Sequence, residues 1–247
     1  MANYTNEKLN PQATAKYYDY LIIGGGMAAD TAARGIREQD SFGSIGILSA
    51  DTDEPYTRPA LTKKLWTDST FTEDQVALNT TKETKNTTLR LNTTVSAIER
   101  DQHRVQLKDG TSIGYKKLLL VTGGEPKKID GPDDEHVILF RERSDYRHLR
   151  DFSGNNQHVI IVGGGYIGSE LAAGLVQNNT RVTLIYPDEV LGGSQFPSVL
   201  AKEYENSFRE AGVNLLNGKR ADSYTKENGK FILQLNDGST VEGDTIV

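Results

Sequence analysis

The sequence contains no cysteine, a single tryptophan and two methionines. Without cysteine the chain has no disulfide, no thiolate metal ligand and no CxxC redox relay. It also lacks any run of about 18 apolar residues, and its polar N-terminal sequence lacks a secretory signal, so the sequence predicts a cytoplasmic protein without a membrane anchor. The net charge of −6 disfavours nucleic acid as a partner. The four histidines lie far apart, without the spacing of a metal site.

With 247 residues, of which 36% are hydrophobic, the chain is long enough for two medium-sized domains. Residues 1–16 are polar and lack hydrophobic periodicity, which predicts a disordered tail. A polar stretch that contains glycine and proline runs from Lys127 to Glu135. This stretch is predicted to separate two lobes, residues 17–126 and residues 127–247.

The most informative stretch reads HVIIVGGGYIGSE. Its β-branched residues predict a buried strand, which runs into three glycines before Tyr166 and Ile167 open a helix. In a dinucleotide-binding turn, Gly163 allows a sharp bend, Gly165 lets the backbone approach a pyrophosphate, and Gly168 lets the helix pack on the strand. The N–H groups at the helix start then bind the phosphates.

A second copy of this device lies near the N-terminus, where residues 19–23 predict a strand that runs into GGGMAAD. Its glycine positions are Gly24 and Gly26, and an alanine, Ala29, takes the third small position. Each half of the chain also contains a later hairpin with an Asp-Gly turn, followed by an apolar strand, which is expected at residues 118–121 in the first half. The sequence stops at Val247, where the first half continues into TGG. It is therefore expected to be a fragment that lacks a C-terminal region.

The fold class that follows is α/β, with two Rossmann-like, three-layer lobes that each carry a β-meander. Two shorter helices are expected as well. Ser144 is predicted to cap a helix over residues 145–150. Residues 197–211 are predicted to form a helix with Val199, Leu200, Tyr204 and Phe208 on its apolar face.

The motif PYTRPALTK contains two cationic residues, Arg58 and Lys63. Pro59 suits the first position of a short helix, so the guanidinium of Arg58 can reach a pyrophosphate at that helix start. Lys63 would lie one turn further along the same helix. The alternative is a proline-bounded loop with solvated cations, and this stretch taken alone slightly favours the loop.

The order of four motifs, GGGMAAD, PYTRPALTK, LLLVTGGEP and GGGYIGSELA, resembles FAD-dependent, pyridine-nucleotide-linked oxidoreductases with two dinucleotide-binding domains. Within that family the chain is similar to bacterial relatives of apoptosis-inducing factor, with ferredoxin and rubredoxin reductases and monodehydroascorbate reductase as cousins. The resemblance implies that the first glycine turn holds the FAD pyrophosphate and the second holds the nicotinamide nucleotide. The further FAD-binding positions that it implies are Arg58, Lys63, Val95, Thr122, Gly123 and Arg141.

The same resemblance implies that Glu170 reaches the flavin and pairs with Lys63. An ion pair between the two lobes would fix their orientation and place a cation near flavin N5, where hydride arrives. Lys63 and Glu170 are therefore the candidate catalytic residues. The alternative for Glu170 is a carboxylate that is favoured by the helix dipole alone.

The two halves differ in how they are expected to hold ribose. In the family, the strand after the first glycine turn ends in an acid that binds the adenosine ribose, but here that position is Ala50. Asp51 is expected to substitute, unless the ribose is held less tightly. In the second half, Asp188 and Glu189 follow the strand at residues 181–185. Carboxylates there accept a bond from a ribose 2′-OH and repel a 2′-phosphate, so NADH is expected over NADPH, with a plain polar loop as the alternative.

These inferences predict an FAD-dependent NADH oxidoreductase in which hydride passes from nicotinamide C4 to flavin N5 through stacking and positioning. Electrons would then leave to an external acceptor, because no cysteine pair is present to receive them. An iron-sulfur protein, a quinone, a small radical and oxygen all remain open, as does a homodimer. The alternative function is a redox-responsive binding protein with slow turnover and a long-lived reduced flavin complex. A third interpretation is that the fragment binds no flavin.

Overall fold

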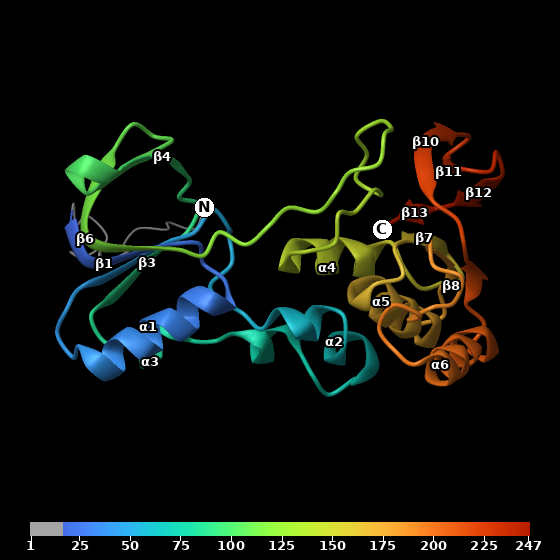
Figure 1. Cartoon of the computed structure of the whole chain (residues 1–247), viewed down its shortest axis with the longest axis horizontal. Helices are drawn as coiled ribbons and strands as arrows, with labels where there is room; N and C mark the ends of the chain where they lie inside the picture. The colour runs from blue at the N-terminus through green and yellow to red at the C-terminus, as the bar shows by residue number, and fades with distance from the viewer. Residues whose placement is uncertain (1–16) are drawn as a thin grey trace, which may run out of the picture. The chain divides into compact units, whose positions relative to one another are not determined.

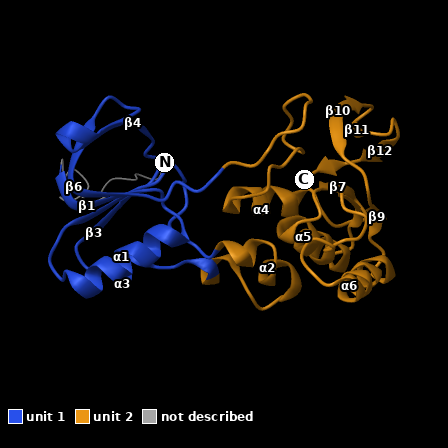
Figure 2. Ribbon diagram, viewed as in Figure 1, with its two compact units in different colours: residues 1–57, 76–124 blue, residues 58–75, 125–247 orange. Residues whose placement is uncertain are grey.

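The computed structural model divides the chain into two compact units (Figure 1). Unit 1 comprises the described residues up to 57 together with residues 76–124, and unit 2 comprises residues 58–75 and 125–247 (Figure 2). Each unit contains one of the two glycine turns that the sequence singles out. The two turns can therefore be compared as parts of separate bodies.

The structure describes residues 17–247. The tail that is predicted to be disordered, residues 1–16, lies outside the described residues. Across residues 17–247, no helix has the length and apolar character needed to cross a membrane.

Residues 58–75 pack with unit 2, although the division drawn from the sequence kept them in the first lobe. The reason is Trp66, whose side chain is 5% exposed. A Cβ added to Gly174 would lie 2.8 Å from the Trp66 Cβ, so only glycine permits this contact. The Trp66 carbonyl also accepts a bond from the Asn178 side chain at 2.9 Å, from a residue 112 positions away in the sequence. No local pattern reveals a contact over that separation.

Unit 1 is built on a six-stranded sheet in the order β3-β2-β1-β6-β5-β4. Strands β3, β2, β1 and β6 are parallel, and β6, β5 and β4 form an antiparallel meander. The strands are β1 (Tyr17–Ile23), β2 (Ile45–Leu48), β3 (Thr87–Arg90), β4 (Val95–Glu99), β5 (Arg104–Leu107) and β6 (Ser112–Leu120). The helical elements are α1 (Met27–Gln39), α3 (Thr80–Glu83) and the 3₁₀ turn η4 (Arg100–Gln102).

Two hydrophobic clusters cover the two faces of the parallel part of this sheet. On one face, Ala29 and Ala33 of α1 pack against Ile45 and Ile47 of β2, and their small side chains let the helix approach the strands. The other face carries the meander. Its buried cluster consists of Tyr18, Leu21, Ile23, Leu48, Val105, Leu107, Ile113 and Tyr115. The predicted order of helix, sheet and meander is confirmed in unit 1.

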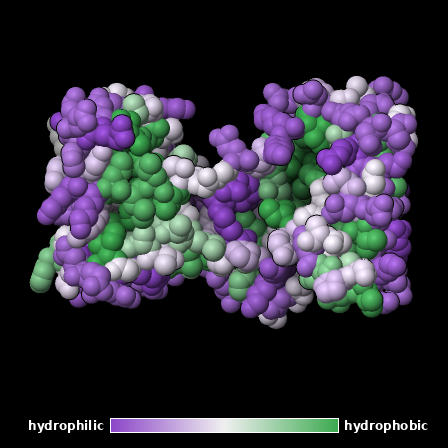
Figure 3. All heavy atoms as spheres, in the orientation of Figure 1, coloured by the Kyte–Doolittle hydropathy of each residue, from purple (hydrophilic) through white to green (hydrophobic). Residues whose placement is uncertain are grey.

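Strand β6 belongs to both the parallel part of the sheet and the antiparallel meander. Its residues 112–114 pair with β5, and residues 114–120 pair with β1. The sequence predicted a hairpin strand and a separate strand over 118–121, whereas the structure has one continuous strand. At its C-terminal end Leu119 and Leu120 are 39% and 54% exposed. Figure 3 shows hydrophobic residues gathered on the visible face of unit 1.

Unit 2 contains a parallel sheet in the order β13-β7-β8-β9 and an antiparallel sheet β10-β11-β12. The strands are β7 (His158–Val162), β8 (Arg181–Ile185), β9 (Asn214–Leu216), β10 (Ala221–Glu227), β11 (Lys230–Leu235), β12 (Thr240–Gly243) and β13 (Thr245–Ile246). The helices are α2 (Lys64–Thr67), α4 (Arg143–Asp151), α5 (Tyr166–Gln177) and α6 (Ser198–Glu210), with the 3₁₀ turn η2 (Arg58–Leu61). A further 3₁₀ turn, η3 (Glu73–Val76), lies where the chain passes to unit 1. A buried cluster of Ile160, Ile185, Tyr224, Phe231, Leu233, Leu235 and Ile246 joins the two sheets.

The start of α4 differs from the prediction. The helix begins at Arg143, and its N-cap is Glu142 rather than Ser144. Glu142 and Asp145 form a capping box, in which the Asp145 carboxylate accepts the Glu142 N–H at 2.6 Å. The reciprocal pair satisfies two N–H groups, whereas a serine cap satisfies one. The capping box therefore favours the helix that starts at Arg143 over the predicted helix that starts at residue 145.

The apolar face of α6 also differs from the prediction. Phe208 is buried as predicted and Tyr204 is partly buried, but Val199 and Leu200 are 76% and 53% exposed. Ala201, which the prediction left off this face, is buried. Residues seven apart share one face of a helix, so the inward stripe runs through Ala201 and Phe208. The first turn of the helix thus presents its apolar residues to solvent.

Candidate functional site

In unit 1 the first glycine turn joins β1 to α1. Gly24 has φ of +114°, a conformation that favours glycine, and a Cβ there would overlap the carbonyl of Val121. The N-cap of α1 is Gly26, and no side chain makes a capping bond there. Ala29 is fully buried at the third small position. This helix start therefore fits an anion, because no side-chain cap occupies the first-turn N–H groups and the helix dipole favours negative charge there.

The other predicted FAD positions of unit 1 lie at the same edge of the sheet, where the carboxyl ends of β1, β2 and β6 meet. Thr122 and Gly123 are exposed there, and the Thr122 nitrogen lies 3.2 Å from a Cβ built on Gly24. Val95 opens β4 after a loop whose N–H groups donate to two carbonyls just after β2, at 2.7 and 3.0 Å. The structure thus brings these predicted positions together within one unit.

Asp51, the expected substitute for the ribose-binding acid, is engaged within its own loop. Its Oδ1 accepts the N–H of Asp53 at 3.0 Å, and its Oδ2 lies 3.5 Å from the Tyr56 hydroxyl. Its own N–H donates to the hydroxyl of Ser49 at 3.2 Å. The carboxylate is therefore already bonded to the loop, and its role toward ribose stays a prediction.

The second glycine turn, in unit 2, joins β7 to α5 with the same backbone conformation. The φ of Gly163 is +119°, close to that of Gly24. A Cβ on Gly168 would overlap the carbonyl oxygen of Gly163, so only glycine lets α5 pack this closely on the turn, as predicted. A Cβ on Gly163 or Gly165 would have no atom within 4 Å. Open space therefore lies in front of this turn.

The start of α5 faces that open space. Its N-cap is Gly165, and no side chain makes a capping bond there. The side chains of Tyr166 and Ile167 are 67% and 48% exposed beside it. Because the first N–H groups of a helix and its dipole attract anions, the turn fits the diphosphate of a dinucleotide.

The loop after β8 carries the two carboxylates that the sequence assigns to ribose. Asp188 and Glu189 are both exposed. The Asp188 carboxylate accepts a long bond, 3.4 Å, from the Ser194 hydroxyl, and the Asp188 carbonyl accepts the Gly218 N–H at 3.0 Å. Tyr186, at the end of the strand, is 1% exposed and lies beneath Gly164, where an added Cβ would be 2.8 Å from the Tyr186 Cβ.

Glu205 of α6, which no sequence pattern singles out, bonds to both ends of this loop. Its carboxylate accepts the Tyr186 hydroxyl at 2.9 Å and the Leu191 N–H at 2.7 Å, and it pairs with Arg209 at 2.9 Å. Burial acts to raise the pKa of Glu205, but these three donors outweigh it and hold the pKa below its ordinary value. Burial, with the neighbouring carboxylate, raises the pKa of the Tyr186 hydroxyl.

Lys63 and Glu170 form an ion pair in unit 2. The Lys63 Nζ lies 3.2 Å from Glu170 Oε1, and the hydroxyl of Thr62 donates to Oε2 at 2.5 Å. Thr62 is 6% exposed, whereas the Lys63 side chain is 55% exposed. The sequence placed this pair between two lobes, but both partners lie within one unit, because residues 58–75 pack with α5. The role of Thr62 was not foreseen, since a threonine beside a lysine carries no signal of its own.

Arg58 begins the 3₁₀ turn η2, one residue earlier than expected. Its Nη1 donates to the Arg141 carbonyl at 2.6 Å, and its Nη2 lies 3.7 Å from Glu142 Oε1. The guanidinium is therefore bonded rather than simply solvated. Arg58 and Arg141, two of the residues of unit 2 that are predicted to face FAD, are in contact, and their role toward FAD stays a prediction.

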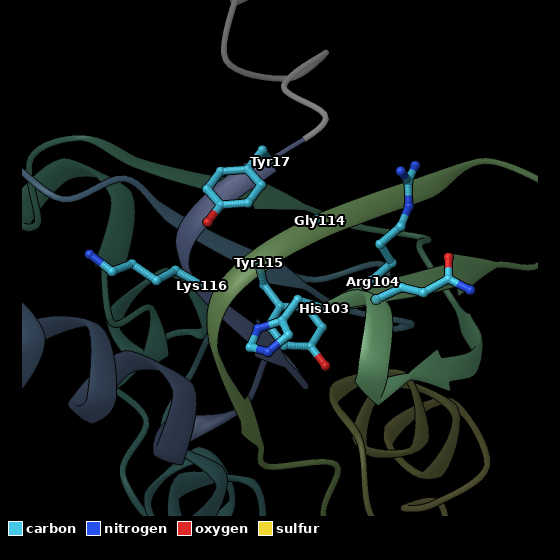
Figure 4. Close-up of a pocket in the computed structure, with 7 residues that line it drawn as sticks. Tyr17, His103, Arg104, Gly114, Tyr115 and Lys116 are labelled. Atoms are coloured by element: carbon cyan, nitrogen blue, oxygen red, sulfur yellow. The ribbon is translucent and has the colours of Figure 1, made fainter.

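A surface hollow in unit 1 does not belong to this site. It is lined by Tyr17, Gln102, His103, Arg104, Gly114, Tyr115 and Lys116. The side chains of Arg104 and Lys116 point away from one another (Figure 4), so their charges do not converge on one ligand. None of the predicted cofactor residues lines it.

A model of the family described as pyridine nucleotide-disulphide oxidoreductase matches residues 18–247. The chain belongs to this family. The family consists of FAD-dependent NAD(P)H oxidoreductases, so the resemblance, the α/β fold class and the pair of cofactors predicted from the sequence are confirmed at the level of the family.

Individual members of the pyridine nucleotide-disulphide oxidoreductase family match most of the chain. Apoptosis-inducing factor 1, mitochondrial, of Dictyostelium discoideum is 31% identical over 98% of this chain and 50% of that protein. The ferredoxin--NAD(+) reductase component of the anthranilate 1,2-dioxygenase system of Burkholderia cepacia is 36% identical over 78% of this chain and 48% of that protein. The putidaredoxin reductase–putidaredoxin complex contains a chain that matches with a TM-score of 0.83 at 26% identity, over 93% of this chain and 57% of that one.

The chain spans about half the length of the first two of these relatives. They include both an apoptosis-inducing factor and a reductase component, so they do not favour the redox-responsive binding protein over the oxidoreductase. The cytoplasmic location stays a prediction, and one relative is named as mitochondrial.

Proposed function

We propose that the chain carries the nucleotide-binding part of an FAD-dependent NADH oxidoreductase that passes electrons to an external acceptor. The observation that carries the proposal is that the same strand, glycine turn and helix motif occurs in both units. Each unit holds a strand, a glycine turn and a helix without a side-chain cap, with φ of +114° at Gly24 and +119° at Gly163. Each turn fits one diphosphate, so the two units account for two dinucleotides.

The first turn would bind the FAD pyrophosphate, with Val95, Thr122 and Gly123 at the same edge of unit 1. FAD, when bound, supplies at N5 the acceptor for a hydride from nicotinamide C4, a chemistry that no side chain of this chain provides. The second turn would bind the pyrophosphate of NADH. Asp188 and Glu189 would then accept the ribose 2′-hydroxyl and repel the 2′-phosphate of NADPH.

The contribution of Lys63 would be electrostatic. The Lys63 ammonium pairs with Glu170, and Glu170 is held by the Thr62 hydroxyl. An ammonium positioned in this way needs little reorganisation when negative charge develops beside it. Arg58 and Arg141 would bind cofactor through the same kind of fixed geometry, since the Arg58 fork is already oriented by its bond to the Arg141 carbonyl. Binding and positioning, rather than an acid–base triad, are thus the work of this chain.

For the acceptor, we propose a ferredoxin. A relative 36% identical to this chain is named as a ferredoxin--NAD(+) reductase component. The 247 residues contain no cysteine pair that could receive the electrons within the chain. A quinone, a small radical and oxygen are the other outcomes of the test.

The test is the visible absorbance of the chain loaded with FAD, followed under anaerobic conditions. Addition of NADH should bleach the flavin band, and NADPH should do so more slowly. Subsequent addition of a ferredoxin should restore the band faster than a quinone, ascorbate radical or oxygen does. A flavin that NADH leaves oxidised would rule out the oxidoreductase, and faster bleaching by NADPH would rule out the cofactor preference.

A further inference from the structure

The loop at residues 187–191 is fastened at both ends to one carboxylate. Oε2 of Glu205 accepts the Tyr186 hydroxyl at 2.9 Å, just before the loop, and the Leu191 N–H at 2.7 Å, at its end. Oε1 is taken by Arg209, at 2.9 Å. The Glu205 side chain is 12% exposed, so the carboxylate acts on the loop rather than on a ligand in solution.

The same two loop ends form the floor under the second glycine turn. A Cβ added to Gly164 would lie 2.8 Å from the Tyr186 Cβ and 3.0 Å from Leu191 Cδ1. Both residues are buried, at 1% and 0% exposure. A shift of the loop would therefore also disturb the packing beneath the turn, because close-packed interiors transmit displacement.

We propose that Glu205 is a positioning residue of the nicotinamide-nucleotide site. It fixes the loop that carries Asp188 and Glu189 relative to the glycine turn, so that ribose and diphosphate are bound together. The inference rests on the proposed function, because it takes unit 2 as the NADH-binding unit. Glu205 itself touches no nucleotide in this account.

The decisive variant is Glu205→Ala. It leaves the Tyr186 hydroxyl and the Leu191 N–H without their acceptor, so the loop loses both bonds to Glu205 and keeps the bonds that its backbone carbonyls accept from residues 217–219. Loss of charge-assisted bonds of this kind should weaken binding of NADH about tenfold or more. ADP-ribose, which lacks the nicotinamide, should lose affinity by the same factor, because the loop serves the adenosine half. Glu205→Gln keeps one acceptor oxygen and should lose less.

The matched control is Arg209→Ala. It removes the partner of the outer carboxylate oxygen and leaves both loop bonds in place, so affinity for NADH and ADP-ribose should change by less than about twofold. Thermal unfolding of each variant separates stability from affinity. If Glu205→Ala does not fold, Tyr186→Phe serves instead, since it keeps the ring beneath Gly164 and removes one fastening. It should weaken ADP-ribose binding by a smaller factor.

The measurement is equilibrium binding of NADH and of ADP-ribose to the whole chain. A Glu205→Ala protein that unfolds at a lower temperature but binds ADP-ribose as the unaltered chain does overturns the positioning role, and so does a Tyr186→Phe protein with unchanged affinity. A loss for NADH without a loss for ADP-ribose overturns it as well. If the unaltered chain binds neither ligand, the proposed function fails and the inference fails with it. Binding by the unaltered chain and by Arg209→Ala, together with weaker binding by Glu205→Ala and Tyr186→Phe, supports both.

Discussion

The Nζ of Lys63 lies 3.2 Å from Oε1 of Glu170, and both residues belong to unit 2. The second carboxylate oxygen accepts the hydroxyl of buried Thr62 at 2.5 Å. Glu170 is therefore held from two sides, while more than half of the Lys63 side chain faces solvent. An ion pair so exposed contributes little to stability, about 0–1 kcal/mol. We therefore expect the pair to act on the reaction rather than on the fold.

Replacement of Lys63 separates a contribution of the ion pair to stability from a contribution to flavin reduction. Lys63→Gln should change the free energy of unfolding by less than about 1 kcal/mol. It should slow the reduction of bound flavin by NADH about tenfold or more, because the proposed function places this charge beside the reacting atoms. Denaturant unfolding and anaerobic stopped-flow absorbance measure the two effects. Lys64→Gln, at the next residue, is the control and should leave the reduction rate unchanged. Flavin reduction at the unaltered rate in Lys63→Gln would show that the pair is only structural.

Two glycines of the second turn should respond to alanine in opposite ways. Gly168→Ala forces a Cβ into the Gly163 carbonyl and should destabilise unit 2 by about 1–3 kcal/mol. Gly165→Ala meets no atom within 4 Å, so it should cost less than about 1 kcal/mol of stability. Its methyl group would stand where a diphosphate approaches, and NADH binding should weaken about tenfold. Thermal unfolding and NADH titration provide the comparison. Full NADH affinity in Gly165→Ala would contradict the placement of the diphosphate.

The contact of Trp66 with Gly174 predicts a change in fluorescence. In Gly174→Ala the added methyl lies 2.8 Å from the Trp66 Cβ, so the indole should be displaced toward water and its emission should shift to longer wavelength. Stability should fall by about 1–3 kcal/mol despite the better helix propensity of alanine. Gly35→Ala, on the exposed face of α1 with nothing within 4 Å, is the control and should stabilise unit 1 by about 0.5–1 kcal/mol. Since the chain has one tryptophan, the emission reports Trp66 alone. An unshifted spectrum in Gly174→Ala would mean that the contact is loose.

Asp134 predicts a pH dependence of stability. A bond from the Lys226 ammonium, helped by the N–H of His136, lowers the pKa of Asp134 from 3.8 to about 2. Because the folded protein holds the proton less tightly than the unfolded chain, this stabilisation is complete above pH 3.8 and is lost as the pH falls toward about 2. Asp134→Asn should therefore cost about 1 kcal/mol near neutral pH, and the difference should shrink on acidification.

Urea unfolding across that pH range checks the prediction. Asp133→Asn, at the exposed neighbouring position, removes the same formal charge and serves as the control. A constant difference between Asp134→Asn and the unaltered chain at every pH would show that the carboxylate is not held by its partners.

The strands and glycine turns could be predicted from the sequence, because they depend on residues that are neighbours in the chain. Runs of β-branched residues followed by glycines identified β1 and β7, because a buried strand and a turn at positive φ both restrict local residue choice. Gly24, Gly163 and Gly168 were assigned their conformations or packing roles correctly for the same reason. The pairing of Lys63 with Glu170 came from the resemblance and not from the local pattern.

What the sequence missed depends on contacts between distant segments. Nothing near Trp66 indicates that it packs against Gly174, so the division drawn from the sequence kept residues 58–75 with the first lobe, whereas they pack with unit 2. Glu205 looks like any solvent-facing acid on a helix until the fold brings Tyr186 and Leu191 to it. The contacts of such side chains depend on the tertiary fold, and a pattern of apolar residues along the sequence does not predict them.

The central claim is that each glycine turn binds the diphosphate of one dinucleotide. A crystal structure of the chain with FAD and NAD⁺ tests it most directly. The account predicts one diphosphate against the N-terminus of α1, at Gly24 to Ala29, and a second against the N-terminus of α5, at Gly163 to Gly168. Electron density for either nucleotide away from its turn, with that helix start facing only water, would contradict it.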